Sequence, residues 1–180
     1  MNCMLRALLL VVIAAPAMAA DTSDQPLTQS ARMDNQRLQA LIRGIADSVD
    51  GRSGYWRFTL HGFSASVITD EKADRMRILV PVAQMSEVDS DTLVRLMQAN
   101  FDSALDARYS VAKGVLWSVF IHPLSALSDH QFVDGLAQTV NLAATYGTTY
   151  SSGALIFGGG DSGQEQNKYY RDIIERGNSI

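Results

Sequence analysis

The stretch GVLWSVFIH, residues 114–122, is the part of the sequence that decides the fold. It begins with a glycine and ends before Pro123, and alternate side chains of an extended chain point to opposite faces. One face would carry Val115, Trp117, Val119 and Ile121, and the other would carry Leu116 and Phe120. A strand that is apolar on both faces lies inside a sheet or is covered by a partner.

Shorter segments before this strand show the same two-residue period. Residues 55–61 and 63–69 alternate on either side of Gly62, and residues 76–82 alternate after a charged turn. This pattern predicts a three-stranded meander. A further strand over residues 107–113 leads through Gly114 into residues 115–122, so we expect five antiparallel strands.

Three helices are predicted around the sheet by apolar positions that recur every three or four residues. The first covers residues 38–49, and Asp50 and Gly51 close it. The second follows the acidic residues 87–91 with Ser90 as its cap, and its apolar stripe includes Met97 and Phe101. The third begins at a capping box over residues 128–131 and runs to about residue 146. The sequence therefore predicts one α+β domain over residues 34–146 with the order α-β-β-β-α-β-β-α.

The first 19 residues predict a secretory signal peptide. Arg6 precedes an apolar run over residues 8–15, and Ala17 and Ala19 form a small-residue cleavage site. Pro16 closes the run well short of the ~20 apolar residues that a membrane span needs. Cleavage after Ala19 leaves 180 − 19 = 161 residues without a cysteine. We expect a product in the periplasm or outside the cell, with no integral membrane segment after cleavage.

Two further segments flank the predicted domain. Residues 20–33 are polar and predict a flexible leader, and residues 147–180 form a Gly/Ser-rich tail. The tail should end in a short helix over residues 167–176 whose apolar side chains are Tyr169, Tyr170, Ile173 and Ile174. Two hypotheses are open: this helix docks on the domain as a pseudo-ligand, or the tail is a linker.

The string GGGDSG, residues 158–163, matches a dinucleotide-binding loop and also resembles the nucleophile loop of trypsin-like proteases. No second parallel strand follows it, and no histidine of the chain sits in a context like that of those proteases. We therefore interpret it as a linker.

Composition excludes several classes of function. The net charge of −4 argues against a protein that coats nucleic acid, and a single cysteine, Cys3, excludes a disulfide framework and a thiolate zinc site. The three histidines, His61, His122 and His130, are scattered, so we expect no metal and no cofactor.

One polar cluster is a candidate for chemistry. Asp102 and Asp106 are four residues apart, and Arg108 follows closely. Paired carboxylates can perform acid–base chemistry, but structural ion-pair networks perturb carboxylates too. The cluster is therefore either part of a hydrolytic site or a network that joins the second helix to the next strand, and we assign no catalytic residue.

The apolar residues exceed what one small sheet layer needs. We predict that some form a partner-binding or dimer surface, because a two-fold dimer would bury them symmetrically. The residues concerned are Met97, Phe101, Val115, Trp117, Val119, Phe120 and Ile121.

The element order, the helix ending in Asn100, Phe101 and Asp102, and the strand over residues 114–122 together resemble the type III secretion chaperones, a family that includes Tir chaperone-like domains. The resemblance covers about residues 34–146. It implies a small acidic homodimer without a catalytic centre, which holds an extended client segment on apolar patches of its sheet and first helix. Those chaperones hold effectors in the cytoplasm, so a signal peptide implies a different client.

The sequence thus predicts an exported, noncatalytic protein-binding module that holds an extended segment of an envelope or secreted protein, as a homodimer and without nucleic acid. Two alternatives are open: a small envelope hydrolase that uses a carboxylate or histidine site, and a structural envelope protein without a discrete ligand.

Overall fold

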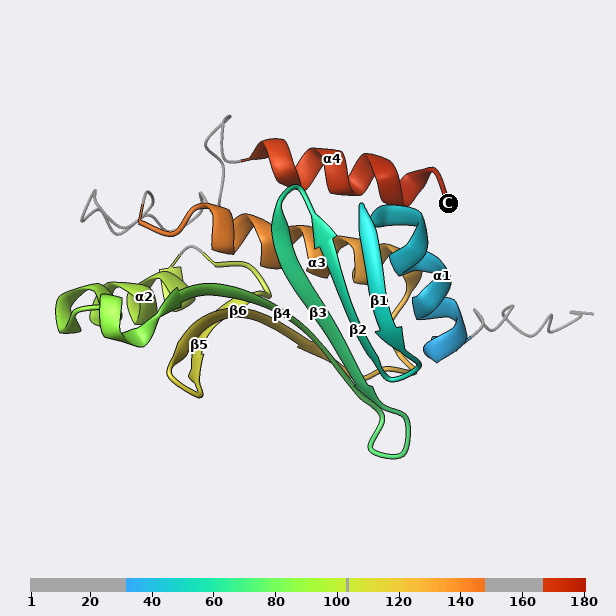
Figure 1. Cartoon of the computed structure of the whole chain (residues 1–180), viewed down its shortest axis with the longest axis horizontal. Coiled ribbons are helices and arrows are strands. Elements are labelled where there is room, and N and C mark those ends of the chain that lie inside the picture. The colour runs from blue at the N-terminus through green and yellow to red at the C-terminus, as the bar shows by residue number, and fades with distance from the viewer. Residues whose placement is uncertain (1–31, 103, 148–166) are drawn as a thin grey trace, which may run out of the picture.

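The computed structural model describes residues 32–102, 104–147 and 167–180. The predicted signal peptide, most of the leader and the GGGDSG string lie outside the described residues. Figure 1 shows the helices and strands coloured in chain order, from blue to red. They are α1 (Asn35–Ile45), β1 (Ser48–Arg52), β2 (Tyr55–Leu60), β3 (Phe63–Asp70), β4 (Arg75–Gln84), η1 (Met85–Glu87), α2 (Ser90–Asp102), β5 (Arg108–Ala112), β6 (Val115–His122), α3 (Asp129–Ala144) and α4 (Asn167–Asn178).

The strands form one antiparallel sheet in the order β1-β2-β3-β4-β6-β5. The doubly apolar strand β6 lies inside the sheet between β4 and β5, as predicted. The sheet has six strands and not the predicted five, because α1 ends at Ile45 and residues 48–52 pair with β2. Val49 continued the helical spacing in the sequence, but it lies opposite Phe58 in the sheet.

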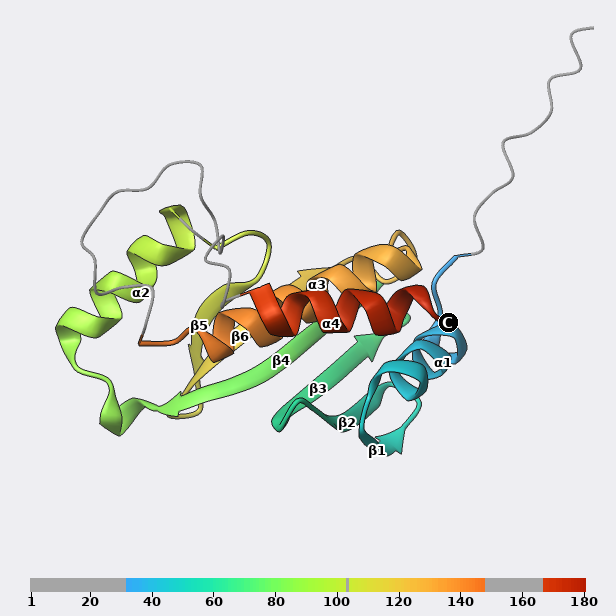
Figure 2. The same ribbon diagram turned by 90° about the horizontal axis from the view of Figure 1, so that it is seen from above.

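Three helices cover one face of the sheet. Figures 1 and 2 show α1, α3 and α4 on the same side, with α4 lying along α3 and reaching α1. The strand side chains that point to these helices are buried, including Trp56, Phe58 and Ile78. On α3, Gly135 lets the Phe120 ring approach closely, since an added Cβ would lie 2.8 Å from ring carbons. The main core therefore lies between the sheet and α1, α3 and α4.

A smaller core lies under α2. Leu96 packs there with Tyr109 of β5, Leu116 of β6 and Leu142 of α3. Asp89 precedes the first residue of α2, and its Oδ1 accepts a hydrogen bond from the Thr92 amide at 2.7 Å. Asp89 therefore caps this helix in place of the predicted Ser90.

Local sequence signals account for the turns and for the start of α3. His61 and Gly62 both have positive φ angles, 52° and 80°, which is the type I′ geometry that a two-residue hairpin favours. At the start of α3, the Ser128 and Gln131 side chains bond each other's backbone amides, which confirms the predicted capping box. Among the described helices, none is long and apolar enough to cross a membrane.

Candidate protein-binding surfaces

The sheet face that points away from the helices carries a continuous set of apolar side chains, and we call it the open face. The strand registers place Ile68, Arg77 and Ile121 in one row across β3, β4 and β6. The next rows contain Leu79 opposite Val119 and Pro81 opposite Trp117. Ile121 is 54% exposed. The apolar members of the open face are Tyr55, Ile68, Leu79, Pro81, Val115, Trp117, Val119 and Ile121.

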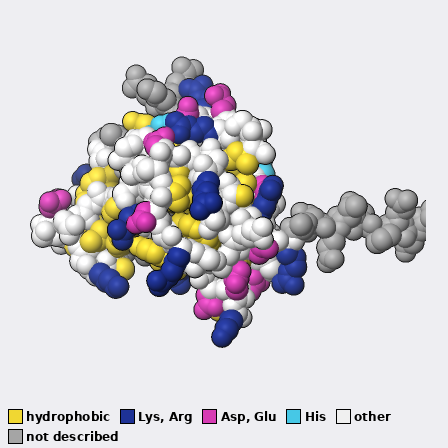
Figure 3. Space-filling view, turned by 45° about the vertical axis from the view of Figure 1, so that its right-hand side comes forward, with side chains coloured by type: hydrophobic (Ala, Val, Ile, Leu, Met, Phe, Trp, Pro, Cys, Tyr) yellow, Lys and Arg dark blue, Asp and Glu magenta, His cyan; other side chains and the backbone are white. Residues whose placement is uncertain are grey.

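Arginines share this face with the apolar residues. The registers place Arg52, Arg57, Arg75, Arg77 and Arg108 on it, with Asp50 opposite Arg57 and Asp70 opposite Arg75. Five positive and two negative side chains give 5 − 2 = +3, on a chain with a net charge of −4. Figure 3 shows hydrophobic side chains next to Lys and Arg side chains in the middle of the face it presents.

These arginines have no strong internal partner in the described part of the chain. None of the five lies in a salt bridge there. Arg57 Nη2 donates to the Tyr55 hydroxyl at 3.0 Å, and Arg108 Nη1 donates to the Ala107 carbonyl at 2.9 Å. Their charges are therefore available to a molecule that covers the open face.

The predicted binding residues of β6 fall on two faces. Val115, Trp117, Val119 and Ile121 lie on the open face, where they are half-buried or exposed. Phe120 is only 6% exposed and packs against α3, so this residue is part of the core and not of a binding surface. The strand's alternation explains the difference, because Phe120 is one position out of phase with the other four.

The outer side of α2 forms a second apolar surface, which we call the α2 stripe. It consists of Val94, Met97 and Phe101, which are 57%, 45% and 77% exposed. These positions are three and four residues apart, so they share one side of the helix. Leu96 and Ala99 on the other side of α2 are buried. Met97 and Phe101 of the predicted surface therefore lie on α2, apart from the sheet residues.

The structure describes the side chains of two of the three residues of the predicted polar cluster, and these two lie in different places. The side chain of Asp102 lies outside the described residues, whereas Asp106 lies against α3. There the buried Gln138 accepts hydrogen bonds from the Asp106 and Ala107 amides at 2.8 and 3.2 Å. Arg108 instead lies on the open face opposite Val119. The contacts of Gln138 anchor the connection between α2 and β5, which is a structural role.

The histidines lie in three separate places. His61 is in the β2–β3 turn, His130 is near the start of α3, and His122 ends β6 with its Nδ1 2.8 Å from the Pro123 carbonyl oxygen. Within residues 32–102, 104–147 and 167–180, no group of three or more His, Cys, Asp or Glu side chains could hold a metal ion. The described residues therefore bring together no histidine-based site.

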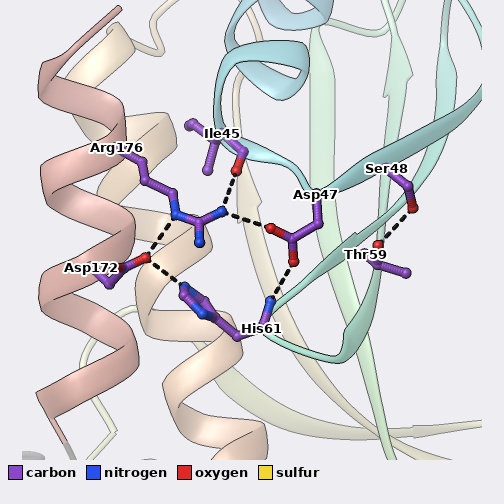
Figure 4. Close-up of polar contacts among 7 residues, drawn as sticks. All are labelled: Ile45, Asp47, Ser48, Thr59, His61, Asp172 and Arg176. Atoms are coloured by element: carbon purple, nitrogen blue, oxygen red, sulfur yellow. Dashed lines mark hydrogen bonds and ion pairs between the residues drawn. The ribbon is translucent and has the colours of Figure 1, made fainter.

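A polar network joins α4 to the α1–β1 connection and the β2–β3 turn, and we call it the C-terminal clamp (Figure 4). It consists of Asp47, His61, Asp172 and Arg176. Arg176 Nη1 donates to Asp47 Oδ1 at 2.8 Å and to the Ile45 carbonyl at 3.1 Å, while its Nε donates to Asp172 Oδ2 at 2.7 Å. The hydrogen bond from Arg176 lowers the pKa of Asp47, because it stabilises the carboxylate.

His61 completes the C-terminal clamp from the β2–β3 turn. Its backbone amide donates to Asp47 Oδ2 at 3.0 Å. Its Nε2 lies 2.8 Å from Asp172 Oδ2, close enough for an ion pair when the ring is protonated but without hydrogen-bond alignment. The imidazole also contacts the ring of Tyr169, with 5.5 Å between centroids. The turn, the α1–β1 connection and α4 therefore hold one another in place.

Apolar contacts bind α4 to the domain as well. Ile173 is fully buried, and Tyr169, Tyr170 and Ile174 pack against the main core. The Tyr170 hydroxyl donates a hydrogen bond to Asp134 of α3; burial and this carboxylate raise the pKa of Tyr170 to about 12. These four side chains are those that the tail hypothesis named, and here they lie on the protein's own domain.

No protein-family model and no curated protein sequence matches this chain. Among solved structures, it is similar to the ExsC–ExsE complex with a TM-score of 0.52 and 12% identity, over 68% of this chain and 100% of the other. Weaker similarities are to the Yersinia pestis type III secretion chaperone SycH with a fragment of YscM2 (TM-score 0.48, 14% identity, 62% and 98% covered) and to the HopA1–SchA chaperone–effector complex (TM-score 0.48, 10% identity, 61% and 88% covered).

The similarity to the ExsC–ExsE structure confirms the predicted resemblance at the level of the fold: the chain has an α+β fold with an antiparallel sheet. In chain order its elements are α-β-β-β-β-α-β-β-α-α, counting η1 apart, so the predicted order lacked β1 and placed the last helix outside the fold.

Proposed function

We propose that this protein is a noncatalytic protein-binding module that holds an extended segment of a client protein on its open face. The observation that carries the proposal is the set of eight apolar side chains on the sheet face that points away from the described helices α1, α3 and α4. Exposed apolar patches rimmed by polar residues mark interaction sites. The likeness of the fold to a structure solved as the ExsC–ExsE complex supports the same role.

The client would be an envelope or secreted protein, because we infer that residues 1–19 direct export and are removed. The test is the mass of the protein recovered from a periplasmic extract and from the medium. We expect a chain that begins at residue 20. Recovery of a full-length chain from the cytoplasm instead would contradict export, and the client would then be a cytoplasmic protein.

We infer further that the protein is a homodimer and that the α2 stripe is its contact surface. Val94 and Met97 are large apolar side chains at the solvent, and the α2 stripe carries no charge. The open face is a poor surface for self-association, since a two-fold contact would bring its excess positive charge against itself. Burial of the α2 stripe between two copies would remove apolar area from water.

Met97→Glu tests the dimer, with Gln98→Glu as the matched control because both positions are exposed on α2. We expect a dimer mass by light scattering for the mature chain and for Gln98→Glu, and a monomer for Met97→Glu. A mature chain that is monomeric, or a Met97→Glu variant that stays dimeric, would contradict this assignment.

The binding role itself is tested by affinity capture from an envelope extract, using the mature chain as bait. Val119→Asp places a charge in the centre of the open face, whereas Gln98→Glu leaves that face intact. We expect a captured protein to be lost with Val119→Asp and kept with Gln98→Glu. Hydrogen exchange of the complex should slow at the edges of the open face. If the Val119→Asp and Gln98→Glu variants both still capture the protein, the open face is not the binding surface.

The alternatives fare differently. A small hydrolase lacks a supporting observation within the described residues, because the histidines are separated and Asp106 is bound to Gln138. A structural envelope protein without a discrete ligand predicts that the capture experiment recovers no partner.

A further inference from the structure

We propose that the client segment that occupies the open face is acidic, with Asp or Glu side chains placed among apolar ones. This inference rests on the proposed function and adds the chemistry of the client to it. It follows from how the arginines and the apolar residues of the open face are arranged relative to one another.

The arginines lie among the apolar residues as well as at the rim of the face. Arg77 lies between Ile68 and Ile121 in its row, and Arg108 lies opposite Val119. Along β4, Arg77 and Leu79 point to this face two residues apart, which is the spacing of alternate side chains on one face of an extended peptide. A peptide across these rows would meet both kinds of side chain.

Guanidinium groups are well suited to carboxylates. Arg presents paired N–H donors that match the two oxygens of a carboxylate, and such charge-assisted bonds are stronger than neutral ones. Covering Arg77 with a purely apolar segment would remove its charge from water without a partner, which is unfavourable. A carboxylate at that position satisfies the charge, and the neighbouring apolar residues cover Ile68 and Ile121.

The charge distribution of the whole chain points to the same client. The open face carries +3, so the remainder of the chain carries −4 − 3 = −7. An acidic segment is repelled elsewhere and attracted to this face, which raises the rate of correct encounters. A second copy of the same face offers only two carboxylates, Asp50 and Asp70, and each already lies opposite an arginine of its own sheet.

Three labelled peptides provide the test, with the full mature chain, residues 20–180, as the binder. All have the same Leu and Phe positions and carry Glu, Gln or Lys two residues away from each of them, so that both kinds of side chain share one face of the extended peptide. Fluorescence anisotropy gives their affinities at low and high salt. We expect the Glu peptide to bind ~10-fold more tightly than the Gln peptide at low salt, and the difference to shrink as salt screens the charges. The Lys peptide should bind most weakly.

Charge reversal on the protein supplies the second arm. Arg77→Glu should weaken the Glu peptide ~10-fold and strengthen the Lys peptide, a gain that an unfolded variant would not show. Arg43→Glu is the matched control, because Arg43 is exposed on α1 and changes the net charge by the same amount. We expect the control to retain the preference for the Glu peptide.

Each other outcome overturns the inference. If the Gln or Lys peptide binds as tightly as the Glu peptide or more tightly, the selectivity for acidic segments is refuted but the proposed function is not. If none of the three peptides binds, both the acidic selectivity and the proposed function are refuted. An equal effect of Arg77→Glu and Arg43→Glu refutes the location. Phosphatidylglycerol vesicles that bind through Arg77 while the Glu peptide does not would assign the face to a membrane. A changed oligomer mass in Arg77→Glu, with unchanged peptide affinity, would assign it to self-association.

Discussion

Replacing Ile173 by alanine should lower the free energy of unfolding by about 2–4 kcal/mol. The Ile173 side chain is fully buried in the main core beneath α4. The substitution removes three carbon atoms, which is worth about 2.4 kcal/mol at about 0.8 kcal/mol for each buried methylene. The cavity left by the removed atoms adds to this loss of stability if α4 cannot move closer to α3 to fill it. The C-terminal clamp resists such a shift, because Arg176 holds α4 to the α1–β1 connection.

Urea unfolding measures this loss, followed by far-UV circular dichroism and by the fluorescence of the buried Trp56. Ile180→Ala is the matched control, because the same atoms are removed from a side chain that is 52% exposed. We expect the control to change stability by no more than about 0.5 kcal/mol. Hydrogen exchange should accelerate in α4 for Ile173→Ala alone. Equal unfolding midpoints for the two variants would refute the conclusion that α4 is anchored by burial of Ile173.

Three other measurements address the remaining features. The raised pKa of Tyr170, about 12 in the folded protein, stabilises the neutral phenol beside Asp134. This stabilisation is complete below the ordinary pKa near 10 and is lost as the pH rises towards 12, so the urea midpoint should fall over that range and Tyr170→Phe should flatten the fall. The pKa of Asp47 is lowered by Arg176, so its contribution is present above the ordinary value of 3.8 and is lost as the pH falls below it. Asp47→Asn should reduce the acid sensitivity of the midpoint between pH 5 and about 2; an unchanged acid limb would count against the bond. Gly114→Ala should cost about 1 kcal/mol in urea unfolding from backbone strain alone, because Gly114 has a φ of +73° and nothing lies within 4 Å of an added Cβ.

Local signals in the sequence predicted those parts of the fold that local interactions determine. The limits of β6 and the capping box at Ser128 were predicted correctly, since strand alternation and reciprocal capping depend on neighbouring residues. Strand β1 was missed because all five of its residues are exposed, so it has no alternation of buried apolar side chains. It exists by pairing with β2, and the Ser48 and Thr59 hydroxyls lie 2.6 Å apart across that pair.

The candidate surfaces were predictable only in part. The alternation of Arg75 and Arg77 with apolar residues was visible in the sequence, and it could have suggested that a single strand face carries both charge and apolar area. Which face stays uncovered depends on α1, α3 and α4 all packing on the same side, and no local pattern specifies that. The same packing placed Phe120 in the core.

The C-terminal clamp makes the two ends of the folded domain depend on each other. The bond from Arg176 to the Ile45 carbonyl spans 131 positions, so the chain must close a loop of nearly its whole folded length to form it. Synthesis proceeds from the N-terminus, and α1 therefore emerges long before the helix that secures it. The domain therefore reaches its final form only after α4 has been synthesised. A protease that removes α4 would therefore loosen the first helix as well, although the two helices lie far apart in the sequence.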